Sequence, residues 1–148
     1  MTDLPFVDEH RVLIAAGPQE VWLALMARVP GFSASETFAR LIGAEPRRAS
    51  GGPLAEGATL PGFRVAEATP THLVRLTGRH RFARYQLALT LTPQPGGTLL
   101  AATTHAEFPG LLGGLYRLGV IGSRGHLILV RRLLRDVRRL AETPGAAG

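Results

Sequence analysis

The sequence predicts an α+β domain in which a curved antiparallel sheet wraps around one long C-terminal helix. From residue 126 to residue 142, apolar side chains recur in steps of three and four, which is the spacing of one helix face. Between residues 59 and 108, apolar and polar side chains alternate instead, as on strands that are buried on one face. The helix and the sheet each have an apolar face that must be shielded from water, so we expect the two faces to pack against one another.

Composition fits a single soluble domain. The 148 residues are within the usual size of one domain, so we expect one domain over residues 1–148 with a frayed tail at 143–148. A hydrophobic content of 45% argues against a disordered chain, and the absence of cysteine excludes disulfides and thiolate chemistry. The first residues lack the apolar core of a secretory signal, and no apolar run has the character of a transmembrane segment. We therefore expect a cytoplasmic protein.

The N-terminal third predicts one strand, two short helices and a loop. Residues 6–16 have the composition of a strand, but their alternation is too irregular to assign an inner face. Pro18 suits the first turn of a helix that we expect over residues 18–26. A second short helix is expected over residues 37–42. Residues 44–58 are rich in glycine and proline, and form either a plain connection or the mouth of a site.

Four strands are predicted in the middle of the chain, at residues 60–68, 72–82, 85–92 and 98–108, with a hairpin connection at 93–97. Even positions are the drier ones in the second and fourth of these strands, and odd positions in the third. We expect the drier side chains to face the helix, among them Val74, Leu76, Leu87, Leu89, Leu100, Ala102 and Ala106.

The last predicted helix covers residues 111–142 and carries most of the net charge. All 17 basic residues are arginines, and the net charge is +6. This segment holds seven arginines against two carboxylates, which leaves +5. The arginines form either an ordinary solvated face or a surface for an anionic membrane or an acidic partner. With 6% aromatic residues and no binding motif, nucleic acid is not expected. The glycines at 119–125 either approach the sheet closely or break the helix.

The predicted order of elements resembles the helix-grip fold of the SRPBCC superfamily, which includes START domains, Bet v 1-like proteins and polyketide cyclases. The run Ala16-Gly17-Pro18-Gln19-Glu20-Val21-Trp22 after the first strand is similar to a family pattern of a small residue, proline, glutamate and Val-Trp. The resemblance implies a cavity between sheet and helix, but no shared reaction. Members bind lipids, hormones or polyketides, and some are cyclases or dehydratases.

Within such a cavity, His80 and Tyr85 are the predicted polar groups. His80 is a core histidine, a ligand contact, or an acid–base partner of Tyr85; the sequence leaves these three open. The strands point a larger set of side chains at the same space. The predicted pocket is bounded by Phe63, His80, Phe82, Tyr85, Leu100, Tyr116 and Val120.

The function expected from these residues is binding of a small hydrophobic or amphipathic molecule. The alternatives are a cyclase- or dehydratase-type enzyme that uses His80 and Tyr85, and a peripheral protein that makes weak contact with an anionic membrane surface or an acidic partner. His105 and Glu107 share one strand face but lack a third ligand at recognisable spacing, so no metal or other cofactor is expected. The ligand and the oligomeric state are not specified by the sequence.

Overall fold

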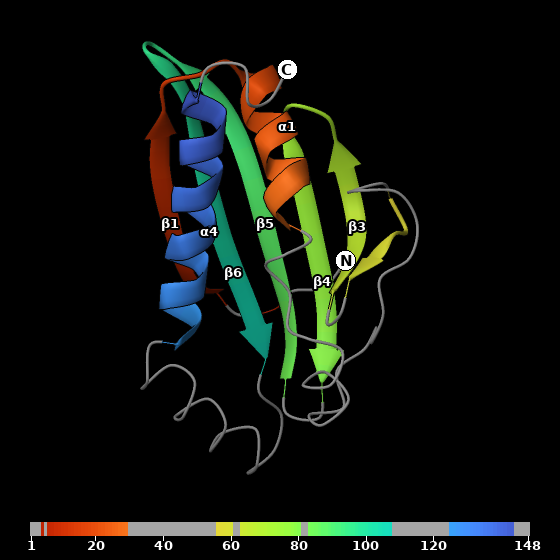
Figure 1. The fold of residues 1–148 in the computed structure, drawn as a ribbon. Helices are drawn as coiled ribbons and strands as arrows, with labels where there is room; N and C mark the ends of the chain where they lie inside the picture. The colour runs from red at the N-terminus through yellow and green to blue at the C-terminus, as the bar shows by residue number, and fades with distance from the viewer. Residues whose placement is uncertain are drawn as a thin grey trace.

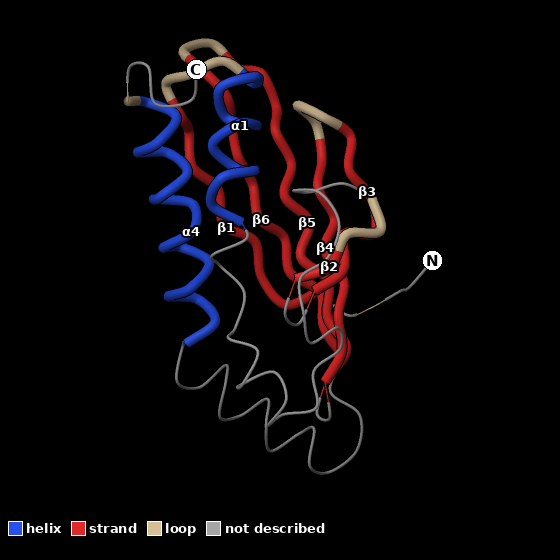
Figure 2. The backbone as a smooth tube through the Cα atoms, turned by 45° about the vertical axis from the view of Figure 1, so that its right-hand side comes forward, coloured by secondary structure: helices blue, strands red, loops and turns tan. Residues whose placement is uncertain are grey.

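The protein forms a six-stranded antiparallel sheet in the strand order β1-β6-β5-β4-β3-β2, and two helices lie side by side on one of its faces (Figure 1). The computed structural model describes residues 4, 6–29, 56–60, 63–80, 83–107 and 125–143. The elements in chain order are β1 (Phe6–Ile14), α1 (Pro18–Arg28), β2 (Thr59–Leu60), β3 (Phe63–Thr69), β4 (Leu73–His80), β5 (Ala83–Gln94), β6 (Gly97–Glu107) and α4 (Gly125–Glu142). Figure 2 shows the sheet curving away behind the two helices. This is the predicted α+β architecture.

Strand β1 contains a β-bulge, which explains why its apolar and polar residues alternate irregularly. Phe6 pairs with His105 and Asp8 pairs with Thr104, so β1 advances by two residues where β6 advances by one. Such a bulge shifts the side chains beyond it to the other face of the sheet. Phe6 is 61% exposed, whereas from Asp8 onward the even positions face the helices and end at the fully buried Ile14. The broken alternation of residues 6–16 is therefore real, and the strand ends two residues earlier than predicted.

The single strand predicted at residues 60–68 is wrong in one respect. Two strands are present here, because β2 turns back and pairs antiparallel with β3. The N–H of Gly57 donates to the carbonyl oxygen of Val65, and the N–H of Val65 donates to that of Ala58, both at 2.8 Å. These bonds give β3 an edge partner, which a lone extended strand would lack.

Strands β4, β5 and β6 match the predicted alternation. Seven of the side chains expected to face the helices are buried: Val74, Leu76, Leu87, Leu89, Leu100, Ala102 and Ala106. Tyr85 is half-buried, and His72, which precedes β4, is exposed. The hairpin between β5 and β6 closes where Gln94 pairs with Gly97. A Cβ at Gly97 would overlap the carbonyl oxygen of Ile14, so glycine is required where the end of β1 meets this hairpin.

The two helices bury complementary faces. Helix α4 buries the predicted stripe of Val130, Leu133, Leu134, Val137 and Ala141, and its five arginines from Arg131 to Arg139 are exposed. Helix α1 buries Val21, Trp22, Ala24 and Leu25. Trp22 is only 6% exposed, as expected for a residue that packs this helix onto its neighbours. Helix α4 contacts both α1 and β1, so its apolar stripe is covered by α1 as well as by the sheet.

Three expectations fall outside the described residues. They are the second short helix at 37–42, most of the loop at 44–58, and the segment from 111 to 124 with the question of its continuity through the glycines.

The C-terminal end of α4 is tied to the end of β1. The Glu142 carboxylate oxygen Oε2 accepts a hydrogen bond from the N–H of Ala15 at 2.8 Å and another from Nε of Arg138 at 3.2 Å. The bond from Ala15, helped by Arg138, holds the pKa of Glu142 below its ordinary value of 4.5. One carboxylate therefore joins the first strand to the last helix.

The buried stripe of α4 predicts unequal effects of two alanine substitutions. Leu133→Ala should lower the free energy of unfolding by about 2–5 kcal/mol, because it leaves a cavity in the core. Arg135→Ala should change it by less than about 0.5 kcal/mol, because the side chain is exposed. Urea titrations of the two variants measure both values, and equal effects would contradict the packing of α4 described here.

The tie at Glu142 predicts a pH-dependent contribution to stability. Because folding lowers this pKa, the carboxylate stabilises the folded state above pH 4.5, and the contribution is lost as the pH falls through the lowered pKa. The melting temperature of Glu142→Gln should therefore lie below that of the wild type at neutral pH and approach it under more acidic conditions. Arg138→Gln, which keeps the bond from Ala15, should show a smaller deficit. A deficit that is constant at all pH values would exclude a role for the charge.

Candidate functional site

The register of the sheet arranges the side chains of its inner face, the face under the helices, in rows that cross the strands. Two neighbouring rows are apolar on β3, β4 and β5 and end in a polar residue on β1. One row runs Val65, Leu76, Leu87, Thr104, Asp8, and the next runs Ala68, Val74, Leu89, Ala102, His10. In these two rows the inner face is therefore apolar on β3, β4 and β5 and polar on β1, whereas further along β1 its inner positions are the apolar Val12 and Ile14.

An aromatic pair lies on the inner face beyond the first of these rows. The rings of Phe63 and Tyr85 meet edge to face, with centroids 5.3 Å apart and planes inclined at 72°. Tyr85 pairs with Gly78, and continuing the β3–β4 register from Arg64 opposite Thr77 places Phe63 beside the same glycine. Strands β3 and β5 are about 10 Å apart, which is two strand spacings. The rings can approach this closely because Gly78 has no side chain between them.

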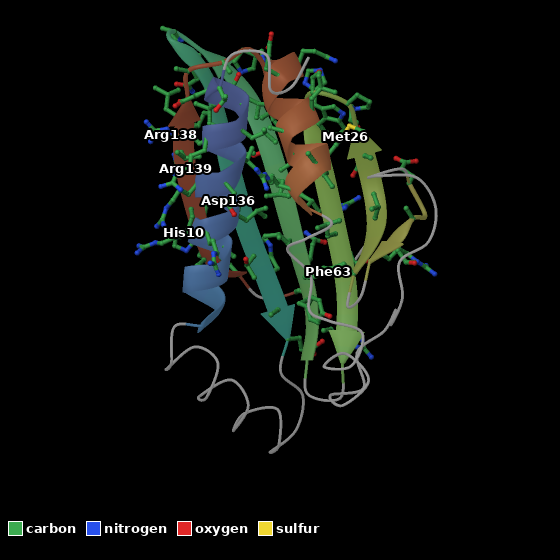
Figure 3. All side chains as sticks on the ribbon, viewed as in Figure 1. His10, Met26, Phe63, Asp136, Arg138 and Arg139 are labelled. Atoms are coloured by element: carbon green, nitrogen blue, oxygen red, sulfur yellow. The ribbon has the colours of Figure 1, made fainter. Side chains whose placement is uncertain are left out.

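A polar pair lies at the other edge of the same face. Nε2 of His10 is 3.4 Å from Oδ2 of Asp8, and the two side chains are 18% and 27% exposed. Figure 3 shows His10 near the β1 edge of the sheet, close to α4, and Phe63 toward the other edge. Their neighbours on β6 are short side chains, Ala102 opposite His10 and Thr104 opposite Asp8.

The structure brings together some of the residues of the predicted pocket. Phe63 and Tyr85 are in contact, and both are half-buried. Leu100 is completely buried in the core under the helices, three rows away from Tyr85 along β6. The backbone of His80 pairs with Ala83 at the end of β4. The side chain of His80 and the residues Phe82, Tyr116 and Val120 lie outside the described part of the chain.

Sequence reasoning missed Asp8 and His10. Their alternation with Val12 and Ile14 is a signal of one strand face, and Ile14 marks that face as buried. The bulge after Phe6 concealed it, because it placed an apolar residue at the start of the strand on the outer face, where Phe6 packs edge to face against His105 at 5.8 Å. Phe6 is even-numbered but lies on the outer face, so the even positions of residues 6–16 did not form one recognisable apolar face.

Two other features limit the chemistry of the described residues. Within this part of the chain, no group of three or more histidine, aspartate or glutamate side chains is placed to hold a metal ion. His105 and Glu107 lie on the outer face of β6, as expected. Neither described helix is long and apolar enough to span a membrane.

No protein-family model matches the chain, and no curated protein matches it by sequence. Several solved structures, in contrast, are similar to the chain in fold. Norcoclaurine synthase from Thalictrum flavum, in truncated form, aligns over 95% of this chain and 97% of its own with a TM-score of 0.56 and 13% identity. A protein from Chromobacterium violaceum aligns over 92% and 96% with a TM-score of 0.55 and 14% identity.

The di-domain ARO/CYC StfQ from the steffimycin biosynthetic pathway aligns over 91% of this chain and 50% of its own, with a TM-score of 0.57 and 11% identity. Identities this low establish the architecture and leave the activity open. The fold that the sequence resemblance implied is thereby confirmed: the chain has a helix-grip α+β fold, as these solved structures do.

Proposed function

We propose that the protein binds a small hydrophobic or amphipathic molecule between the inner face of the sheet and the C-terminal helix. The observation that carries this proposal is the Phe63–Tyr85 pair, which stays half-buried at the margin of a core whose other large side chains are almost fully buried. Binding sites for small molecules are mostly apolar and aromatic, with a few polar groups that orient the ligand.

The chemistry of the pair suits an amphipathic ligand. Phe63 packs against the buried core cluster, so the pair is held by rigid neighbours and keeps its shape when a ligand arrives. Tyr85 adds a hydroxyl group to an otherwise apolar surface. Two proteins with the same fold, the norcoclaurine synthase and StfQ, carry names that refer to small organic products, which supports a ligand of this size class.

Binding requires less of this site than catalysis does. A cyclase or dehydratase that uses His80 and Tyr85 needs an acid and a base at matched positions. The backbone of both residues lies at the same end of the sheet, with Tyr85 opposite Gly78 and His80 two residues further along β4. A binding function uses the aromatic pair alone, so we place binding first and the enzyme second.

Removing one ring of the pair should weaken binding of an apolar dye. We expect Phe63→Ala to lower the affinity for a dye that fluoresces in apolar surroundings by about tenfold, because part of an aromatic contact surface is lost. A fluorescence titration of the folded protein measures the change. Tyr85→Phe, which keeps both rings, should retain most of the affinity for this apolar probe.

The matched control is Phe6→Ala. Phe6 is also half of an edge-to-face pair, with His105, but it lies on the outer face and is 61% exposed. Its removal should leave dye affinity unchanged. Equal losses in Phe6→Ala and Phe63→Ala, or no dye binding by the wild type, would refute the proposal.

Filling the space over Gly78 tests the same pair in the opposite way. Gly78→Val introduces a side chain between Phe63 and Tyr85 while favouring the strand conformation. We expect the variant to remain folded by circular dichroism and to lose dye affinity as Phe63→Ala does. Ala88→Val, on the outer face of β5, is the control and should bind the dye normally. Unchanged dye binding by folded Gly78→Val would show that the ligand does not use the pair.

A further inference from the structure

The outward side of α4 carries a concentration of positive charge that the binding site proposed above does not use. Five exposed arginines occur within nine positions, and we name them the arginine face: Arg131, Arg132, Arg135, Arg138 and Arg139. The buried stripe of the same helix occupies the positions between them, so the arginines lie on the side that faces away from the sheet. Figure 3 shows Arg138 and Arg139 projecting outward from α4. Asp136, the carboxylate in this stretch, is half-buried.

Most of this charge is not neutralised within the described part of the chain. Arg138 pairs with Glu142 at 3.2 Å, and no described carboxylate lies within ion-pair distance of the other four arginines. On the outer face of β1, by contrast, Arg11 pairs with Glu9 at 2.8 Å. The arginine face therefore keeps a strong positive charge over about 12 Å of helix.

The crowding of these charges costs helix stability. Arg135 has an arginine three or four residues away in both directions, at positions 131, 132, 138 and 139. Like charges at these spacings are neighbours on a helix surface and repel one another. A partner with negative charge would relieve this repulsion. We propose that the arginine face binds the headgroups at the surface of an anionic lipid bilayer.

The shape of the helix layer favours a bilayer over a nucleic acid. Helices α1 and α4 lie side by side on one face of the sheet (Figure 2), so the arginine face belongs to a broad layer and not to a single projecting helix. The major groove of DNA is about 12 Å wide and admits one helix, not two abreast. A bilayer presents a broad surface whose negative potential attracts every arginine that comes near it.

An exposed leucine lies on the same side of the layer. Leu23 of α1 is 36% exposed, and its neighbours Trp22 and Ala24 are buried, so it points away from the sheet as the arginines do. Apolar side chains beside basic ones are typical of helices that lie on a membrane surface. The arginines can bind headgroup phosphates while Leu23 contacts the less polar layer beneath them, so a bilayer uses both features.

The packing of α4 restricts how it can meet a membrane. Its apolar stripe, which includes Val130, Leu133 and Val137, is buried in the core and cannot enter the bilayer while the protein stays folded. Contact is therefore mainly electrostatic and should weaken steeply with salt. The sheet and both helices should keep their native packing in the bound state.

Sedimentation with lipid vesicles tests the proposal. We expect the wild type to bind vesicles of equal parts phosphatidylcholine and phosphatidylglycerol at low salt, and to be released at about 1 M salt, where the Debye length is about 3 Å. Vesicles of phosphatidylcholine alone should not bind it. A triple variant with Arg131→Gln, Arg135→Gln and Arg139→Gln should bind the anionic vesicles about a hundredfold more weakly, or about fivefold for each arginine.

The matched control removes three exposed arginines from the outer face of the sheet, by Arg11→Gln, Arg64→Gln and Arg84→Gln. It lowers the net charge by the same amount and should bind the vesicles nearly as the wild type does. Equal losses in the two triple variants would show that net charge alone attracts the protein, and would overturn the proposal. If the α4 triple variant does not fold, Arg135→Gln compared with Arg84→Gln decides in the same way, with an expected loss of about fivefold.

Two further outcomes would also overturn the proposal. One is binding of the wild type to soluble polyglutamate but not to anionic vesicles, which would assign the arginine face to an acidic protein partner. The other is a shift of the Trp22 emission maximum to its denatured value on vesicle binding. Trp22 is buried beneath α1, so such a shift would mean that the helices leave the sheet and insert their apolar faces. We expect the emission maximum to remain unchanged.

Discussion

The pairing of β1 with β6 is the constraint on which the rest of the structure depends. It returns the first strand of the chain to the last strand of the meander, and α4 then packs on β1. Three further contacts gather at the end of this pairing. The hydroxyl of Thr98 donates to the carbonyl oxygen of Ala16 at 2.8 Å, Gly97 lets the backbone of Ile14 approach, and Glu142 binds the N–H of Ala15. The end of β1 and the end of α4 are thus fixed at one corner, and the bulge in β1 decides which of its side chains face inward.

That corner is filled by the core, and the site features lie toward the opposite end of the strands. Ile14, Leu100 and Thr98 are completely buried there. Along the same strands, the inner face ends in Tyr85 on β5 and Asp8 near the start of β1, both half-buried. The binding site that we propose therefore lies at the end of the strands opposite the fully buried part of the core. Substitutions of the half-buried Tyr85 should cost less stability than those of the fully buried Leu100.

The sequence predicted those parts of the fold in which apolar residues recur at a regular spacing. The stripe of α4 and the alternation of β4, β5 and β6 follow directly from spacings of three to four and of two, and the structure confirms them. The edge-to-face contact of Phe63 with Tyr85 needed the register as well, since only pairing shows that both rings lie over Gly78. The inner position of Asp8 and His10 was missed although they alternate with Val12 and Ile14, because the bulge after Phe6 places an apolar even-numbered residue on the outer face.

The distribution of charge bears on the binding function that we propose. The five exposed arginines of α4 account for much of the net charge of +6, and they give the outside of the helix layer a positive potential. That potential disfavours cationic ligands at a distance, although Asp8 would accept a cation on contact. The same field favours ligands that carry a negative charge, so an amphipathic ligand with an acidic polar group fits the proposed function better than one with a basic group.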